Sequence, residues 1–326
     1  MLPLLISLAC AHRVAPYAPT QHLPSPALGQ VFGQQDPTAV FHEALARRDE
    51  GDAQGAVDRL VWLREQGDDS PALLYQLGLA YELAGDFETA LGVYQLLAQE
   101  DEQERYVLDV GFRRAMCLES LGRWDEALRA YRRLPQTAGF DRHDRLTLDL
   151  ALGMAELRAG RARQGQQLLE RSLAATSSTN EVPWMRAKAW YTLADVELDR
   201  AGELGLVGSQ RKQVRVLEQR AAAIALAEQY LVQVVTLEEP EWILAGLLSL
   251  GDAYADLRRD MLAVPAPGDL SEEEAAHYRA VLDQRTQVLL RKAYEAYDQG
   301  LLVAGKFQIR NEATALLRQR RDSLVL

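Results

Sequence analysis

The chain has 326 residues, of which 48% are apolar and 25% are charged, and its formal net charge is −11. This length and apolar content are sufficient for a sizeable buried core. The acidic balance argues against a nucleic-acid-binding protein, because phosphate contacts need clustered lysine and arginine. Helical periodicity dominates and Val-rich alternating runs are few, so we expect an all-α protein with almost no strand.

The chain opens with an apolar run, residues 1–9, that ends at Cys10. With the small residue Ala9 before the cysteine, the segment resembles a bacterial lipoprotein signal. The resemblance implies a lipid on Cys10 and, because Ala11 follows, sorting to the periplasmic side of the outer membrane. Two departures stand against it: Ser7 occupies the place of an aliphatic residue, and no Lys or Arg precedes the run. A start further upstream and an ordinary apolar tail are the alternatives.

A proline-rich segment, residues 11–36, follows the cysteine. Its composition does not support a packed element, so we predict a disordered tether of about 26 residues with a reach of roughly 30 Å. The most apolar later stretch, residues 243–250, is far too short to span a bilayer. Contact with a membrane is therefore expected only through a lipid on Cys10.

A glycine-led turn recurs along the next 140 residues. Each turn starts at a glycine and reaches a small residue five positions later, in the pairs Gly51 and Ala56, Gly85 and Ala90, Gly122 and Ala127, and Gly160 and Gly165. The spacing from Ala56 to Ala90 is 34 residues, which is the period of two antiparallel helices with their turns. The pattern predicts four helical pairs over residues 37–176.

The second of these units carries the clearest signature. The residues that carry the repeat pattern are Leu74, Leu77, Gly78, Tyr81, Ala90, Tyr94 and Leu97. This resembles the tetratricopeptide repeat (TPR) family, in which small residues let the two helices of a unit approach while large ones fill the space beside them. The resemblance implies an α-solenoid, a right-handed superhelix of helical hairpins that presents a binding surface. Arg47 and Arg114 replace apolar residues of the pattern and weaken single units.

The remaining chain continues the pattern in stretched form. Residues 182–262 are expected to form diverged TPR-like helical pairs, including a helix from about Lys212 to Leu237. Residues 269–326 are expected to be C-terminal capping helices, one from Ser271 to about 304 and one over about 309–324. Ser271 and Glu274 have the spacing of a capping box, which satisfies free amides in the first turn.

No motif for catalysis or cofactor binding stands out. A phosphate-binding glycine loop and a pair of histidines at helical spacing are both absent, so neither a cofactor nor a metal site is predicted. The one compact polar cluster, Asp141, His143 and Asp144, precedes a repeat helix and is interpreted as its cap. Cys117 lies within a repeat helix and is interpreted as a buried apolar residue. We therefore predict a non-enzymatic protein.

The concave face of the array is the predicted binding surface. In the TPR family the first helix of each unit lines the groove, one place after the glycine position and three before it. A strip of apolar side chains occupies these positions: Phe41, Leu45, Tyr75, Leu79, Phe112, Met116, Leu150 and Met154. Glu82 and Glu119 are expected to edge it. A peptide or helix of another protein would bind there; the alternative is that neighbouring helices bury these residues.

One known binding mode of the family is excluded by sequence. TPR co-chaperones clamp a terminal carboxylate with Lys and Asn on successive first helices, and only Arg113 fits that pattern here. The favoured function is a lipid-tethered scaffold in the envelope of a Gram-negative bacterium, serving a secretion, assembly or gliding-motility machine. The alternatives are a cytosolic TPR adaptor without lipid and an accessory α-superhelix of an enzyme. The oligomeric state is left open.

Overall fold

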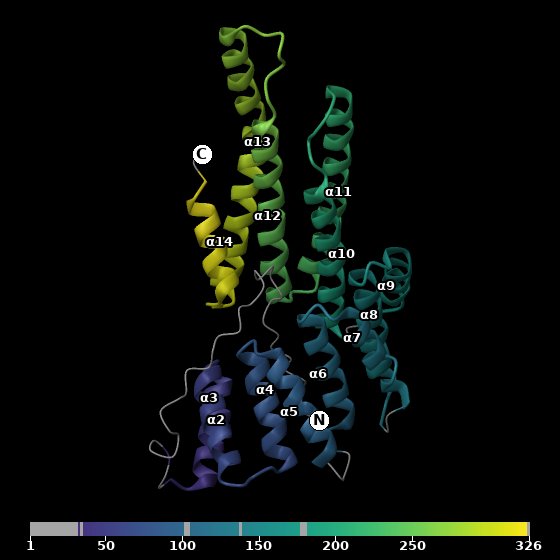
Figure 1. The fold of residues 1–326 in the computed structure, drawn as a ribbon, viewed down its shortest axis with the longest axis vertical. Helices are drawn as coiled ribbons and strands as arrows, with labels where there is room; N and C mark the ends of the chain where they lie inside the picture. The colour runs from purple at the N-terminus through teal and green to yellow at the C-terminus, as the bar shows by residue number, and fades with distance from the viewer. Residues whose placement is uncertain (1–31, 33–34, 101–104, 137–138, 177–180, 325–326) are drawn as a thin grey trace. The chain divides into compact units, whose positions relative to one another are not determined.

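The computed structural model describes residues 32, 35–100, 105–136, 139–176 and 181–324. Over these residues the chain contains α-helices, one short 3₁₀ turn and no strand, so the all-α prediction is confirmed (Figure 1). Cys10 and almost all of the predicted tether lie outside the described residues. The predictions of a lipid and of a disordered linker therefore stay predictions.

The chain divides into two compact units. The first comprises Met1–Leu148 and Ala155–Gly165, and the second comprises Asp149–Met154 and Gln166–Leu326. The helices of the first unit are α2 (Pro37–Asp49), α3 (Ala53–Glu65), α4 (Pro71–Leu83), α5 (Phe87–Glu100), α6 (Val107–Ser120) and α7 (Trp124–Tyr131), followed by the 3₁₀ turn η1 (Leu134–Gln136). The division passes through α8 (Arg142–Arg158) and α9 (Ala162–Thr176).

The second unit consists mainly of long helices. They are α10 (Pro183–Glu203), α11 (Gln210–Thr236), α12 (Pro240–Ala263), α13 (Glu272–Lys306) and α14 (Glu312–Asp322). In Figure 1, α12 and α13 lie side by side as a long antiparallel pair, with α14 next to α13 at the C-terminus. The helices predicted from about Lys212, Ser271 and residue 309 are therefore confirmed, the last with a start three residues later.

The glycine-led turns end the first helix of each early repeat. Gly51, Gly85, Gly122 and Gly160 have φ angles of +82°, +75°, +70° and +80°. Residues with a Cβ rarely adopt this left-handed conformation, so glycine is the residue that can stop the helix and reverse the chain. At Gly85, for example, the next amide, that of Asp86, donates to the carbonyl of Tyr81 and closes the helix end.

Side-chain caps begin several helices where the sequence predicts. The carboxylate of Asp141 accepts from the amide of Asp144, and Asp144 accepts from the amide of Asp141, so the predicted polar cluster is a capping box. Ser271 and Glu274 make the same reciprocal pair at the start of α13. These contacts satisfy amides that would otherwise lack partners in the first turn. The interpretation of the polar cluster as a helix cap is thus confirmed.

Aromatic rings pack on glycines where the two helices of a hairpin meet. A Cβ on Gly78 of α4 would overlap the ring of Tyr94 on α5, and a Cβ on Gly251 of α12 would overlap the ring of Tyr297 on α13. Tyr94 is fully buried, and its hydroxyl donates to Glu82, so the ring is held on both sides. The first unit and the last long hairpin therefore use one packing device, although the repeat pattern between them is stretched.

The tether predicted for residues 11–36 is wrong at its C-terminal end. Phe32 is 5% exposed and belongs to the core of the first unit. Its ring lies 5.8 Å from the ring of Trp62, and the guanidinium of Arg59 lies 5.3 Å from its centroid. The composition of the segment concealed this contact, because composition averages over many residues and does not show that one aromatic ring can enter a core.

We predict that Gly78→Ala destabilises the protein by about 1–3 kcal/mol, because the added methyl group overpacks a ring that cannot move. The matched control is Gly92→Ala. Gly92 lies inside α5 with nothing within 4 Å of a built Cβ, so the same change should stabilise the helix by about 0.5–1 kcal/mol. Urea unfolding followed by circular dichroism measures both. Equal effects of the two substitutions would contradict the packing described here.

Candidate functional site

The inner helices α2, α4 and α6 are joined by polar contacts between neighbouring repeats. Arg48 of α2 donates to the side-chain oxygen of Gln76 on α4. One repeat later, Arg113 of α6 forms an ion pair with Glu82 of α4 at 3.1 Å. Gln76 and Arg113 occupy the same place in successive units, so the two contacts are equivalent. A side chain near the end of one inner helix thus contacts the middle of the next.

A buried polar cluster forms between α4, α5 and α6. It consists of Tyr75, Glu82, Tyr94, Asp109 and Arg113. The Nε atom of Arg113 donates to Asp109 at 2.8 Å, and the hydroxyl of Tyr75 donates to the same carboxylate oxygen at 2.7 Å. Tyr94 donates to the Glu82 oxygen that Arg113 does not contact. Because the groups satisfy each other, the cluster resists rearrangement.

Burial and charge pairing act in opposite directions on this cluster. Burial raises the pKa of Glu82, while the Arg113 charge and the Tyr94 hydroxyl oppose that rise. Burial would lower the pKa of Arg113, but Asp109 and Glu82 outweigh it and hold the pKa above its ordinary value. Burial also raises the pKa of Tyr75 to about 12. The phenol of Tyr75 therefore stays protonated at neutral pH and remains a donor to Asp109.

The prediction that Glu82 and Glu119 edge the groove is wrong. Both are 8% exposed, and each carboxylate accepts from a buried tyrosine of the following helix, Tyr94 and Tyr131 respectively. Their sequence positions are those of groove residues, but the tyrosine hydroxyls turn them inward. Arg113 is also committed inside the protein, with a side chain 8% exposed between two carboxylates. It does not offer a charge to a terminal carboxylate.

The apolar strip is only partly accessible. Phe41, Leu45, Tyr75, Leu79 and Phe112 are half-buried on α2, α4 and α6. Tyr75 is flanked by Tyr106, whose ring stacks on it with centroids 4.7 Å apart. Neither Tyr106 nor Asp109 was predicted to belong to this surface. The pairing of Asp109 with Arg113 could have been inferred from their i, i+4 spacing on one helix.

Three residues of the strip are core residues, contrary to the expected exposure. Met116 is 7% exposed, Met154 is 3% exposed and Leu150 is fully buried. Leu150 and Met154 also belong to the second unit, whereas the other strip residues belong to the first. The burial of these three side chains follows the alternative that neighbouring helices cover them. The accessible part of the strip is therefore restricted to the five half-buried residues of the first unit, here named the inner-helix strip.

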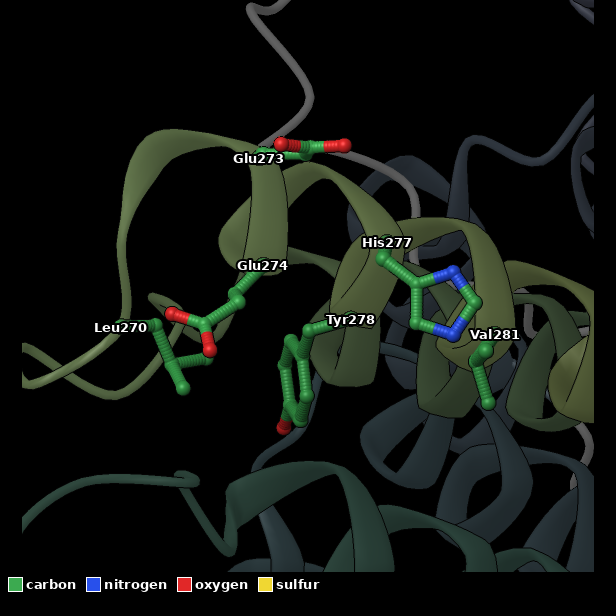
Figure 2. A pocket seen from close by; sticks show the side chains of 6 residues that line it. All are labelled: Leu270, Glu273, Glu274, His277, Tyr278 and Val281. Carbon is green, nitrogen blue, oxygen red and sulfur yellow. The ribbon is translucent and has the colours of Figure 1, made fainter.

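Other features of the described structure give weaker evidence for a functional site. Leu270, Glu273, Glu274, His277, Tyr278 and Val281 line an open pocket of about 600 Å³ along the first turns of α13 (Figure 2). All lie on α13 or directly before it, and Glu274 already caps the helix. In the described part of the chain, no three His, Cys, Asp or Glu residues are placed to hold a metal ion. Burial raises the pKa of the Cys117 thiol, which disfavours the reactive thiolate.

Comparison with known proteins agrees with the repeat geometry. The tetratricopeptide repeat family matches residues 72–102 and 109–137, which coincide with the hairpins α4–α5 and α6–α7. The chain therefore contains tetratricopeptide repeats over these two hairpins. No curated protein matches the sequence. None of the described helices of this TPR protein combines the length and hydropathy of a bilayer-spanning helix.

Two solved structures are similar to the chain. One is a TPR repeats protein from Bacteroides fragilis, with 14% identity over 78% of this chain and 99% of that chain, and a TM-score of 0.34. The other is the C-terminal part of a TPR repeat-containing protein from Cytophaga hutchinsonii, with 12% identity over 87% of this chain and 95% of that chain, and a TM-score of 0.41. Both scores are below 0.5, so neither likeness carries an argument about function.

We predict that Arg113→Met lowers the free energy of unfolding by about 3–5 kcal/mol, because Glu82 and Asp109 lose a buried cation. The double variant Arg113→Met with Glu82→Gln should recover part of this loss, since the unpaired carboxylate is then removed as well. Chemical unfolding of the two single variants and the double variant gives the coupling energy. A coupling energy near zero would mean that the ion pair does not stabilise the junction of α4 and α6.

Proposed function

We propose that this TPR protein is a non-enzymatic scaffold that binds a segment of another protein along the inner-helix strip. The observation that carries the proposal is the recurrence of half-buried apolar side chains on three successive inner helices, with Phe41 and Leu45 on α2, Tyr75 and Leu79 on α4, and Phe112 on α6. Apolar side chains that are partly accessible in a repeat array are suited to burying the apolar face of a peptide or helix.

The cluster behind the strip supports this role. Tyr75 is fixed by Asp109, by Arg113 over its ring at 5.6 Å, and by the stacked ring of Tyr106. A side chain held in one orientation loses little conformational entropy when a ligand covers it. The α4–α6 junction is therefore a preorganised part of the proposed surface.

The most direct probe of the surface is Leu79→Glu. Leu79 is half-buried and lies outside the polar cluster, so a carboxylate there can reach water while opposing an apolar ligand. The matched control is Leu302→Glu on α13, where the leucine is 60% exposed. We expect Leu302→Glu to change stability by no more than about ±0.5 kcal/mol, as is usual at exposed positions. Leu79→Glu should keep its helicity and its cooperative unfolding, because the new carboxylate can reach water.

The binding assay uses peptides selected from a random peptide library displayed on phage and panned on the full-length protein. Selected peptides should lose at least about tenfold in affinity for Leu79→Glu, a change of about 1.4 kcal/mol, and keep their affinity for Leu302→Glu. Phe112→Glu provides a second position on α6. Peptides that bind wild type and Leu79→Glu equally would show that the strip is not the binding surface.

For the location of the protein, we propose a lipid on Cys10 and attachment to the periplasmic side of the outer membrane of a Gram-negative bacterium. The apolar run before Cys10 and the proline-rich segment after it support this proposal. A scaffold held there would serve a secretion, assembly or gliding-motility machine. The alternative is a cytosolic adaptor with the same binding strip and no lipid.

Labelling with radioactive palmitate separates these two locations. We expect the precursor expressed in a Gram-negative host to incorporate label, and Cys10→Ala to lose both label and membrane association. Cys117→Ala is the matched control, because Cys117 is the second of two cysteines and is buried in α6. Wild-type protein that stays soluble and unlabelled would favour the cytosolic adaptor.

A further inference from the structure

A line of apolar residues runs along the exposed side of α11, and no element of the described structure covers it. The opposite face of this 27-residue helix is buried and includes Ala223, Ala227 and Val234. On the outer face, Val214 is 49% exposed and Val232 is 58% exposed, and Ala221 and Ala225 are also exposed. These four residues, Val214, Ala221, Ala225 and Val232, are named the outer α11 face.

The four residues form one straight line along the helix. Their spacings are seven, four and seven residues, and at about 100° per residue all four lie within about 20° of a common line. The line is about 27 Å long. Scattered apolar residues on a surface need no explanation, but a line of this length on one helix indicates a contact surface.

The line has the same pattern in both directions. Valine, alanine, alanine and valine follow each other with symmetric spacing, so an antiparallel copy of α11 would place Val214 opposite Val232 and Ala221 opposite Ala225. The alanines at the centre let two helix backbones approach, and the valines fill the space at each end. A two-fold symmetric contact requires this kind of self-complementary surface.

The charges at the ends of α11 also favour a second, antiparallel copy. Arg211, Lys212 and Arg215 lie in its first two turns, and no ion pair of theirs occurs among the described residues. Cations are unfavourable at this end of a helix, where the helix dipole is positive. Glu238 and Glu239 lie just beyond the C-cap residue of α11, at the end where the dipole is negative. An antiparallel pair brings the basic start of one helix to the acidic end of the other.

We propose that this protein forms a homodimer in which the outer α11 faces of two copies pack antiparallel about a two-fold axis. The flanking residues are compatible with this register, since Glu218 of one copy then lies near Gln229 of the other and Arg215 near Gln233. The contact is small for a protein–protein interface, so the dimer forms with micromolar affinity. It leaves the inner-helix strip of the first unit to other partners.

The first test measures the oligomeric state of the full chain by sedimentation velocity between about 1 and 200 μM, a range that brackets micromolar affinity. Wild type should pass from monomer to dimer across this range. Ala225→Glu and Val232→Gln should remain monomeric, because they place polar groups in the centre or at the end of the contact. Gln219→Glu is the matched control: residue 219 is exposed on α11 but lies about 140° from the line, so dimerisation should be unchanged.

Circular dichroism and melting temperature confirm that each variant is folded. A wild-type monomer at every concentration would overturn the proposal, and so would a dimer that persists in both folded variants. Because Ala225 and Val232 are both exposed, at least one of the two variants is expected to fold like wild type.

The second test fixes the orientation of the two helices. In a background with Cys10→Ser and Cys117→Ala, protein carrying Val214→Cys is mixed with protein carrying Val232→Cys and oxidised. The antiparallel contact predicts a disulfide-linked heterodimer between the two proteins, and much less product from either alone. Efficient linkage of Val214→Cys to itself would instead indicate a parallel pair and overturn the proposed arrangement.

Discussion

The close approach of paired helices over a glycine is the packing on which the rest of the structure depends. At Gly78 the missing Cβ leaves room for the ring of Tyr94, and at Gly251 it leaves room for the ring of Tyr297. In the first unit, the hydroxyl of that buried ring then needs an acceptor, and Glu82 supplies it. A buried carboxylate in turn needs a cation, which Arg113 supplies from the next repeat. The missing Cβ of Gly78 thus leads to a series of buried polar contacts. The last of them, between Glu82 and Arg113, joins this hairpin to the next one.

The polar contacts behind the inner helices also determine which side chains form the candidate binding surface. Arg113 and Asp109 serve the polar cluster, so the surface above them is left to apolar side chains such as Tyr75, Leu79 and Phe112. Affinity would come from buried apolar area, and specificity from the shape between the inner helices. Such a surface suits a scaffold better than an enzyme, and the TPR repeats agree with that role.

The second unit extends the same packing with much longer helices. There the outer face of α11 departs from the usual surface of a repeat hairpin, because valines and alanines replace the polar residues that solvent favours. If two copies join through this face, the inner-helix strips of both copies remain separate surfaces. A dimeric scaffold could then hold two partner segments at once, which raises the apparent affinity for a partner that itself has two copies.

The sequence by itself determined the helices and their ends, because these depend on local properties. Gly51, Gly85, Gly122 and Gly160 adopt a conformation that residues with a Cβ avoid, and Asp141 and Ser271 cap the helices that follow them. The sequence also identified which residues lie on the inner helices α2, α4 and α6, because the repeat period fixes their places in each unit.

Only the tertiary structure decided which of those positions face solvent. Glu82 and Glu119 are turned inward by tyrosines on the second helix of their own hairpin, and Met116 and Leu150 are covered by the packing around them. Phe32 joined the core despite its proline-rich surroundings. Burial is a property of contacts between residues that are distant in sequence, so the local pattern that places a side chain on a helix cannot say what covers it.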